Sequence, residues 1–331
     1  MPLINRCGGG GGTPQLCGQV ENFKVLPGTT ALTAALSWTA PSPDEDNSFV
    51  GARIVRKTGS APTGINDGTV VYEGTALSYT DTGLTDGTTY YYRAFAYNAK
   101  KKYQTEYRVA SLTAIAIYSN FADNTWDAII NACHLGNVPD TWVAGDSKTM
   151  TIDGVNYQFD IVGKNHDTYT AGGIAPLTFG LHDCYGTKYP MNSSQTNSTG
   201  WNGSKMRTET LAAILAKMPV NIQNGIRAVN KLTATSGGNS TIKTASDKLF
   251  TFSEMEVYGS RRYSYSGEGE QYDYYKAGNS KVKKVGSTAS WWWLRSPITS
   301  GSISYCAVNT DGSVGSIDAS LSEGVCFGFC F

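Results

Sequence analysis

The segment 290–331 constrains the fold of this chain more than any other stretch. It opens with three consecutive tryptophans in the run 291–297 (WWWLRSP) and closes with the run 324–331 (GVCFGFCF). Both runs are apolar and aromatic, whereas the residues between them are mostly small and turn-forming. Such ends can be anchored in a core while the middle is exposed. Tyr, Ser, Gly and Asn are also the residue types that are common in binding loops. Tyr in particular supplies contact area at low entropic cost.

Alternation within this tract separates expected ligand contacts from framework. Cys306 and Val308 are apolar and two residues apart, so they should share the inward face of a strand, with Tyr305, Ala307 and Asn309 facing outward. The ligand-contacting residues are expected to be Thr299, Ser300, Ser302, Ser304, Tyr305, Ala307, Asn309, Ser313, Ser316, Ile317, Asp318, Ser320 and Leu321. The framework is expected to include Trp293, Leu294, Cys306, Val308, Val325, Phe327 and Phe329. Alternation would also bury Trp291 and Trp293 and turn Trp292 the other way.

Length and composition indicate two domains of a β-rich protein. A chain of 331 residues can bury two cores. Charged residues make up 16% of it, the net charge is zero and no sizeable basic patch exists, so we expect no nucleic-acid partner. No apolar run is long enough for a transmembrane helix, and no signal peptide is recognisable at the start. We therefore expect a virion protein released by lysis, or an extracellular or cell-surface protein exported without a cleaved signal.

Residues 1–19 are expected to form a glycine-rich tether. Cys7 is followed by five glycines, which hold no fixed conformation unaided. Two interpretations remain open: a disordered leader, or an attachment peptide that orders only against virion or tail proteins.

Residues 20–118 have the pattern of a β-sandwich, with short segments rich in Val, Ile, Thr and Tyr between turn signals. This region resembles the fibronectin type III family. Trp38 matches the family's core tryptophan, and the run 84–90 (LTDGTTY) matches its corner, in which the Tyr90 hydroxyl bonds back to the backbone. No cysteine lies between Cys17 and Cys133, which excludes an antibody-type disulfide. Such modules are usually spacers or adhesion units.

Residues 119–331 are expected to form an α+β domain, so that the whole chain is mostly β. Asn124 can cap a helix that ends at Gly136, and Asp153-Gly154 is a hairpin turn signal. A second helix is expected over 204–218, a strand over 248–252, and a capping box at Ser253-Glu256. The runs WWLRSP, CxVxxDGS and GVCFGFC resemble the variable region of C-type-lectin-fold proteins that retroelements diversify in phage and bacteria. The resemblance implies a lectin-like ligand-binding domain with a variable tract over 298–323.

Candidate sites for catalysis or metal binding are weak in this sequence. His166-Asp167 and His182-Asp183-Cys184 are adjacent pairs, and adjacent strand residues point to opposite faces, so a triad is not expected. The loop motifs of calcium-dependent lectins are missing, and no CxxC pair is present. We therefore expect no metal and no cofactor. Cys133, Cys306 and Cys330 lie among apolar residues and should be buried thiols.

These features favour a non-enzymatic receptor-binding adhesin, a phage tail or virion protein that binds a protein or glycan receptor on a cell surface. A carbohydrate-active or protein-modifying enzyme and a non-variable virion decoration protein remain as alternatives. Arg295 is expected to bond to backbone beneath the tract. The tyrosine-rich stretch 263–275 could be a second contact surface or a subunit interface of a homo-oligomer, and the sequence does not choose between them.

Overall fold

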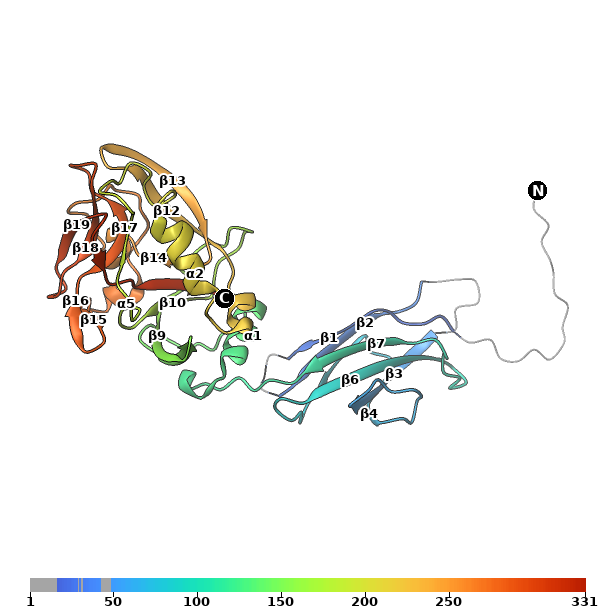
Figure 1. Cartoon of the computed structure of the whole chain (residues 1–331). Coiled ribbons are helices and arrows are strands. Elements are labelled where there is room, and N and C mark those ends of the chain that lie inside the picture. Colours follow the sequence, from blue (N-terminus) through green and yellow to red (C-terminus); the bar gives the residue numbers. More distant parts are fainter. Residues whose placement is uncertain (1–16, 29, 31, 43–48) are drawn as a thin grey trace, which may run out of the picture. The chain divides into compact units, whose positions relative to one another are not determined.

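The computed structural model describes residues 17–28, 30, 32–42 and 49–331, so most of the expected tether, 1–16, lies outside the described residues. The chain divides into two compact units, 1–117 and 118–331 (Figure 1). Among the described residues, no helix is both long and apolar enough to cross a membrane.

The first unit is a sandwich of two antiparallel sheets, as the alternating pattern predicted. One sheet has the order β1-β2-β5 and the other the order β4-β3-β6-β7. Their strands are β1 (Glu21–Pro27), β2 (Ala34–Thr39), β3 (Phe49–Thr58), β4 (Thr69–Gly74), β5 (Ser78–Asp81), β6 (Thr89–Asn98) and β7 (Arg108–Thr113). Trp38, Leu36, Ile54 and Tyr92 pack between the sheets, each at most 3% exposed.

The corner before β6 has the predicted bond, because the Tyr90 hydroxyl accepts from the Thr85 amide at 3.0 Å. The start of the sandwich lies earlier than predicted. Cys17 is 1% exposed, and the Gln19 side chain donates to the Ala94 carbonyl at 3.2 Å. Residues 17–19, expected to belong to the tether, are thus part of this core, because Gln19 satisfies backbone groups of β6.

The second unit is built on a five-stranded sheet of order β14-β21-β10-β9-β8. The strands are β8 (Ser147–Ile152), β9 (Val155–Lys164), β10 (Leu177–Leu181), β14 (Phe250–Thr251) and β21 (Phe327–Cys330). The β8–β9 hairpin turns at Asp153 and Gly154, whose φ values of 50° and 77° confirm the predicted turn. The rings of Phe159, Phe179 and Phe329 pack together, with centroids 5.3–5.4 Å apart, so the predicted closing strand is the centre of the core.

The helices of this unit are short. They are η1 (Phe121–Asp123), α1 (Trp126–Leu135), the π-helical η2 (Met206–Thr210), α2 (Leu211–Leu215), α3 (Val220–Gly225), α4 (Glu254–Tyr258) and α5 (Asp273–Lys276). Thr125, not Asn124, caps α1, because the Asn124 side chain is bonded to the backbone of Tyr118 and Asn120. The predicted helix over 204–218 is present but shorter, as η2 running directly into α2 over 206–215, and the predicted capping box at Ser253 and Glu256 is also present.

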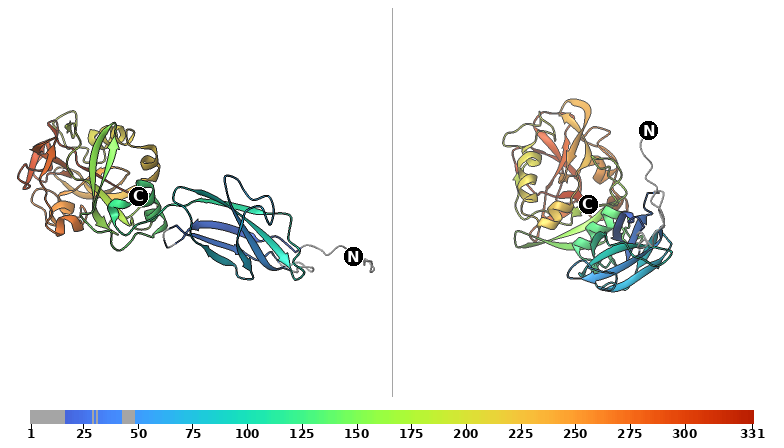
Figure 2. Two further views of the ribbon diagram at one scale, coloured as in Figure 1. Left: turned by 90° about the horizontal axis from the view of Figure 1, so that it is seen from below. Right: turned by 90° about the vertical axis from the view of Figure 1, so that its right-hand side faces the viewer.

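The remaining strands are β11 (Tyr189–Pro190), β12 (Val229–Ser236), β13 (Asn239–Asp247), β15 (Lys283–Val285), β16 (Thr288–Ser290), β17 (Trp292–Pro297), β18 (Ser304–Val308), β19 (Val314–Asp318) and β20 (Ser322–Glu323). The β12–β13 hairpin was not predicted, and the strand expected over 248–252 shrinks to β14. Within the second unit, β17, β18 and β19 lie on the side away from α1 and the C-terminus (Figures 1 and 2).

Candidate ligand-binding surface

The first apolar run and the tract that follows it fold as a three-stranded sheet, β17-β18-β19. In its register Tyr305 lies opposite Ile317 and Cys306 opposite Ser316. The Tyr305 hydroxyl donates to the Gly200 carbonyl at 2.9 Å, and the Cys306 sulfur lies 3.7 Å from a Glu254 carboxylate oxygen. Both faces of β18 are therefore covered, and all five of its residues are buried.

This cover corrects part of the predicted contact set. Ser304, Tyr305, Ala307 and Ile317 are buried, Tyr305 and Ala307 completely, so they belong to the framework. Tyr305 and Ala307 do share the face opposite to Cys306 and Val308, but residues 191–201 pack over that face. The Gly200 carbonyl, for example, accepts the Tyr305 hydroxyl at 2.9 Å.

The tryptophan run also departs from simple alternation. Trp292 and Trp293 are both 0% exposed, whereas Trp291 is partly exposed. The indole of Trp292 donates to the Lys281 carbonyl at 2.9 Å, and that of Trp293 to the Tyr189 carbonyl at 2.8 Å. The expected outward turn of Trp292 is wrong, because β17 is covered on both faces.

Nine predicted contact residues do reach solvent. Asn309, Asp318 and Thr299 are half-buried, and the exposed ones are Ser300, Ser302, Ser313, Ser316, Ser320 and Leu321. Ser316 lies in the middle of β19, opposite Cys306, and the other eight lie at two ends of the sheet, because the β18–β19 ladder runs from the pair Ser304 and Asp318 to the pair Val308 and Val314. Asn309 and Ser313 are at the second end.

The first end forms what we call the tract surface, residues 299–303 and 318–322. Its two loops are joined by the Ala319 amide, which donates to the Ile303 carbonyl at 2.9 Å. Asp318 accepts from the Ser304 hydroxyl at 2.8 Å and also from the Gln195 amide. Ile303 and Leu321 expose 41% and 52% of their surface, so this end offers apolar as well as polar contacts.

A neighbouring loop, 261–265, extends this surface and was not assigned to it from the sequence. The Thr299 amide donates to the Tyr263 carbonyl at 2.8 Å. From below, the buried Glu254 carboxylate accepts the backbone amides of Arg262 and Ser264, each at 2.6 Å. Arg262 is exposed and lies over the Tyr263 ring, 5.3 Å from its centroid. The Arg-Arg-Tyr-Ser-Tyr run after the capping box was the available signal.

The tyrosine-rich stretch divides between surface and core. Tyr263 and Tyr265 are half-buried beside Thr299, and the Tyr265 hydroxyl lies 3.5 Å from the Thr299 carbonyl. Tyr272, Tyr274 and Tyr275 are buried instead. Only the first two tyrosines are placed to serve as a second contact surface.

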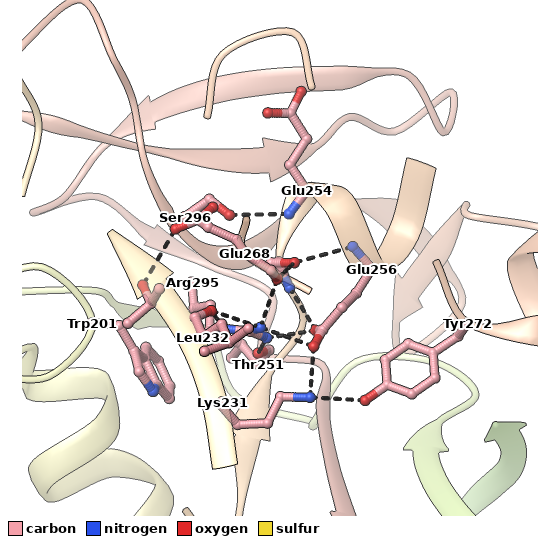
Figure 3. Close-up of polar contacts among 12 residues, drawn as sticks. Trp201, Lys231, Leu232, Thr251, Glu254, Glu256, Glu268, Tyr272, Arg295 and Ser296 are labelled. Atoms are coloured by element: carbon pink, nitrogen blue, oxygen red, sulfur yellow. Dashed lines mark hydrogen bonds and ion pairs between the residues drawn. The ribbon is translucent and has the colours of Figure 1, made fainter. Parts of the chain in front are cut away.

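Beneath the surface lies a buried polar network around Arg295 (Figure 3). Arg295 is 0% exposed and pairs with both carboxylate oxygens of Glu256, one of them at 2.8 Å. Its guanidinium also donates to the carbonyls of Leu232, Thr251 and Glu268 at 2.9–3.1 Å. This confirms the predicted bonding of Arg295 to backbone. One side chain thus ties β17 to β12, β14 and α4.

Lys231 extends the network toward the centre of the unit. Its ammonium lies 2.6 Å from Glu256 and 2.7 Å from Asp167, and it donates to the Tyr272 hydroxyl at 2.9 Å. Burial alone would raise the pKa of the Asp167 carboxyl, but Lys231 holds it well below its usual range. Burial likewise opposes ionisation of Glu256, yet Arg295 and Lys231 lower its pKa. Both carboxylates therefore stay charged and paired, which is how buried charges are tolerated.

Glu268 is the member of this region that titrates near neutral pH. Burial raises its pKa from 4.5 to about 7, although its carboxylate accepts from the Ala234 amide at 2.8 Å. Because the pKa of Glu268 is higher in the folded protein than in the unfolded chain, the protonated carboxyl stabilises the fold. This contribution is fully present below pH 4.5 and is lost as the pH rises through 7.

We therefore expect Glu268→Gln to flatten the pH dependence of melting. The melting temperature of the parent should fall between pH 5 and pH 8, and the variant should fall less, because glutamine stays neutral. The pKa of His182 is also raised, mainly by its bond to Asp160, and this too lowers the melting temperature as the pH rises. The effect is the same in the parent and the variant, so it does not alter the difference between their slopes. Equal slopes in scanning calorimetry would contradict this assignment.

The histidine and cysteine candidates do not assemble a nucleophilic site. His166 stacks on Tyr272 with ring centroids 4.0 Å apart, and His182 Nδ1 lies 2.8 Å from Asp160. The Cys184 thiol is buried, and burial raises its pKa, which disfavours a thiolate. Cys133, Cys306 and Cys330 are buried free thiols, as predicted.

Over the described part of the chain, no group of three or more His, Cys, Asp or Glu side chains is arranged to hold a metal ion. We expect millimolar calcium to leave the melting temperature unchanged, because calcium sites need six to eight oxygen ligands. A rise of several degrees that a chelator reverses would show that a calcium site has been overlooked.

Comparison with known proteins adds one match in this unit. A family model described as "Domain of unknown function (DUF6273)" matches residues 178–329, under half of the 331-residue chain. The match runs from β10 into β21 and so includes the tract, the loop 261–265 and Arg295. No match was found among curated proteins.

Solved structures similar to this chain include fibronectin type III domains. The sixth such domain of human fibronectin type III domain containing protein 3 is 21% identical, with 33% of this chain and 93% of that domain covered and a TM-score of 0.25. A computationally redesigned β-sandwich protein is 24% identical, with 30% of this chain and 93% of that protein covered and a TM-score of 0.24. The assignment of the first unit as fibronectin type III-like rests on its own sheet order and Tyr90 corner.

Proposed function

We propose that residues 118–331 form a C-type-lectin-like binding domain, with 298–323 as its variable tract. The chain would be a receptor-binding adhesin of a phage tail or virion, and the fibronectin-like unit would be its spacer. One observation carries the proposal: the exposed side chains of the tract stand on a frame that does not need them. Within the described residues, the side chains of Ser300, Ser302, Ser316 and Ser320 make no hydrogen bond.

Substitutions on the exposed surface and in the buried frame should differ in their effect on the free energy of unfolding. Substituting an exposed residue outside special backbone positions usually changes this free energy by no more than about 0.5 kcal/mol. The frame, in contrast, is held in place by the Arg295 network and the buried tryptophans. A copying process that alters only the codons of the exposed residues in the tract would therefore change the surface without unfolding the domain. Arg262 and Tyr263 add the residue types that dominate binding energy at protein interfaces.

A protein or glycan receptor on a bacterial cell surface is the partner that this arrangement fits. The tract surface combines two exposed apolar side chains, Ile303 and Leu321, with several hydroxyls, as adaptable binding loops do. Attachment to a virion would fall to the segment 1–16, which lies outside the described residues. No specific observation favours an enzyme over this function.

The proposal is tested most simply at the level of the gene. We expect a second copy of the sequence encoding 298–323 near the gene, differing from it mainly at adenines. The codons that differ should encode exposed residues such as Ser300, Ser302 and Leu321, and should spare those of Arg295 and Trp293. A neighbourhood without such a copy, or differences spread evenly over the frame, would contradict diversification.

A further inference from the structure

A hollow of about 450 Å³ opens in the second unit, beside the end of β21. It is lined by residues 169–172, 226–228, 246 and 248. One of its walls is held to the core, because the Arg227 amide donates to the Cys330 carbonyl at 3.0 Å. The hollow is thus near the C-terminus, on the other side of the unit from β17, β18 and β19 (Figure 1). None of its residues belongs to the tract surface, and the proposed function does not use them.

The three segments that line the hollow are tied to one another. The Tyr169 amide donates to the Gly173 carbonyl at 2.9 Å, which closes the first segment into a turn. The Thr170 amide donates to the Ala228 carbonyl, also at 2.9 Å, and so joins the first segment to the second. The Thr170 hydroxyl lies 2.9 Å from the Ser246 hydroxyl, which joins the first segment to the third. The hollow is therefore formed without a ligand, as small-molecule sites usually are.

Much of the lining is apolar. Ile226 is 2% exposed and Tyr169 is 7% exposed, so both side chains are fixed by packing beneath the hollow. The Tyr169 hydroxyl donates to the carbonyl of Phe331, a residue that is 0% exposed. The hydroxyl end of Tyr169 is therefore directed into the core. Ala171 and Ala228 have only methyl groups, which leaves room for the hydrocarbon part of a ligand.

Two cations line the same hollow, and neither forms an ion pair within the described part of the chain. Arg227 and Lys248 are both exposed. The Arg227 guanidinium lies over the Tyr169 ring, 5.5 Å from its centroid. The Lys248 ammonium donates to the Gln223 carbonyl at 3.3 Å. These contacts orient the two side chains but do not neutralise their charges.

The hollow is therefore positively charged. The described residues that line it include no Asp or Glu. Asp247, which precedes Lys248 in the chain, is 5% exposed and its carboxylate pairs with Arg207 at 2.5 Å. Like charges repel, so an anion that is bound by both cations would stabilise the folded protein. Guanidinium and ammonium groups form charge-assisted hydrogen bonds with carboxylate and phosphate groups.

Charge, lining and volume together define the kind of ligand. A small inorganic anion would leave the apolar walls unused, and a neutral hydrocarbon would leave the two cations without a partner. The volume of 450 Å³ lies within the range of about 300–1,000 Å³ that is typical of small-molecule sites. The ligand should therefore be a small molecule that has one anionic group and an apolar chain.

We propose that this hollow binds a small amphiphilic anion, in which a single carboxylate or phosphate group is attached to an alkyl chain. The anionic group bonds to Arg227 and Lys248, and the alkyl chain packs on Tyr169, Ile226 and Ala228. The ligand is bound reversibly and is not chemically changed.

The test uses the full chain with octanoate and octyl phosphate. Octanol and octylammonium are matched probes without the negative charge, and acetate is a matched probe without the chain. Isothermal titration calorimetry should give at least one of the two amphiphilic anions a Kd on the order of 0.1–1 mM. The other three probes should bind at least tenfold more weakly.

Two variants at exposed positions test the assigned cations. Arg227→Gln and Lys248→Gln should each weaken binding of the amphiphilic anion about tenfold, because each removes a charge-assisted hydrogen bond. Arg261→Gln and Lys243→Gln remove exposed cations elsewhere in the unit, so they are the matched controls and should bind like the parent. The anion should also raise the melting temperature of the parent and of both controls more than that of the two variants, since it binds only the folded state.

Melting curves without ligand show whether each variant is folded. The proposal is overturned if neither amphiphilic anion binds, if octanol or octylammonium binds equally well, or if either variant is folded and binds like its control. Alanine at Ser300, Ser302, Ile303 and Leu321 should leave binding of the anion unchanged, so this proposal and that of the tract surface can fail separately.

Discussion

Replacing Arg295 with alanine should lower the free energy of unfolding of the second unit by about 3–5 kcal/mol. The change leaves the Glu256 carboxylate buried beside Lys231 alone and removes the donors to the Leu232, Thr251 and Glu268 carbonyls. Lysine should rescue little of this loss, because an ammonium cannot reach acceptors that a planar guanidinium bonds on several sides. Denaturant unfolding followed by tryptophan fluorescence reports on this unit, since Trp38 is the one tryptophan of seven that lies in the sandwich.

The matched control is Arg262→Ala, which removes an exposed guanidinium from the same unit. We expect its free energy of unfolding to stay within about 0.5 kcal/mol of the parent. If Arg295→Ala proved equally mild, the network would not be what fixes β17 beneath the tract.

Replacing Trp38 with alanine should destabilise the sandwich alone, by about 3–5 kcal/mol. Trp38 is 3% exposed in the first core, and the chain divides into two compact units at residues 117 and 118. Scanning calorimetry of the variant should show one transition lowered and the other unmoved. A single lowered transition that includes both units would mean that their cores do not fold separately.

Local patterns in the sequence predicted local structure well. The capping box at Ser253, the Asp153-Gly154 turn and the Tyr90 corner each depend on residues within a few positions of one another. The alternation of Tyr305 with Cys306 was also correct as a statement about faces. It failed as a statement about exposure, because the cover over Tyr305 comes from Gly200, which lies 105 residues away.

The parts that sequence could not show depend on several distant segments meeting. The network of Arg295 unites Glu256 with Lys231 and Asp167, from separate elements. The loop 261–265 joins the candidate surface only through its pairing with Thr299 and its anchoring by Glu254. Long-range pairings of this kind leave no periodic signal in a single sequence.

The central claim is that the exposed side chains of the tract bind a partner and do not support the fold. It is tested most directly with a variant in which Ser300, Ser302, Ile303, Ser316, Ser320 and Leu321 are all replaced by alanine. The labelled parent chain is first screened by flow cytometry against a panel of bacterial strains. Binding of the variant is then measured on the strain that the parent stains most strongly. A control carries alanine at exposed residues of β13, such as Lys243 and Thr244.

We predict that staining by the tract variant is lost while the control stains like the parent. Melting should show both variants folded, within about 2–4 °C of the parent, the shift expected for 1 kcal/mol in a unit of this size. A folded tract variant that stains as strongly as the parent, a tract variant that unfolds, or a parent that stains no strain would each contradict the account.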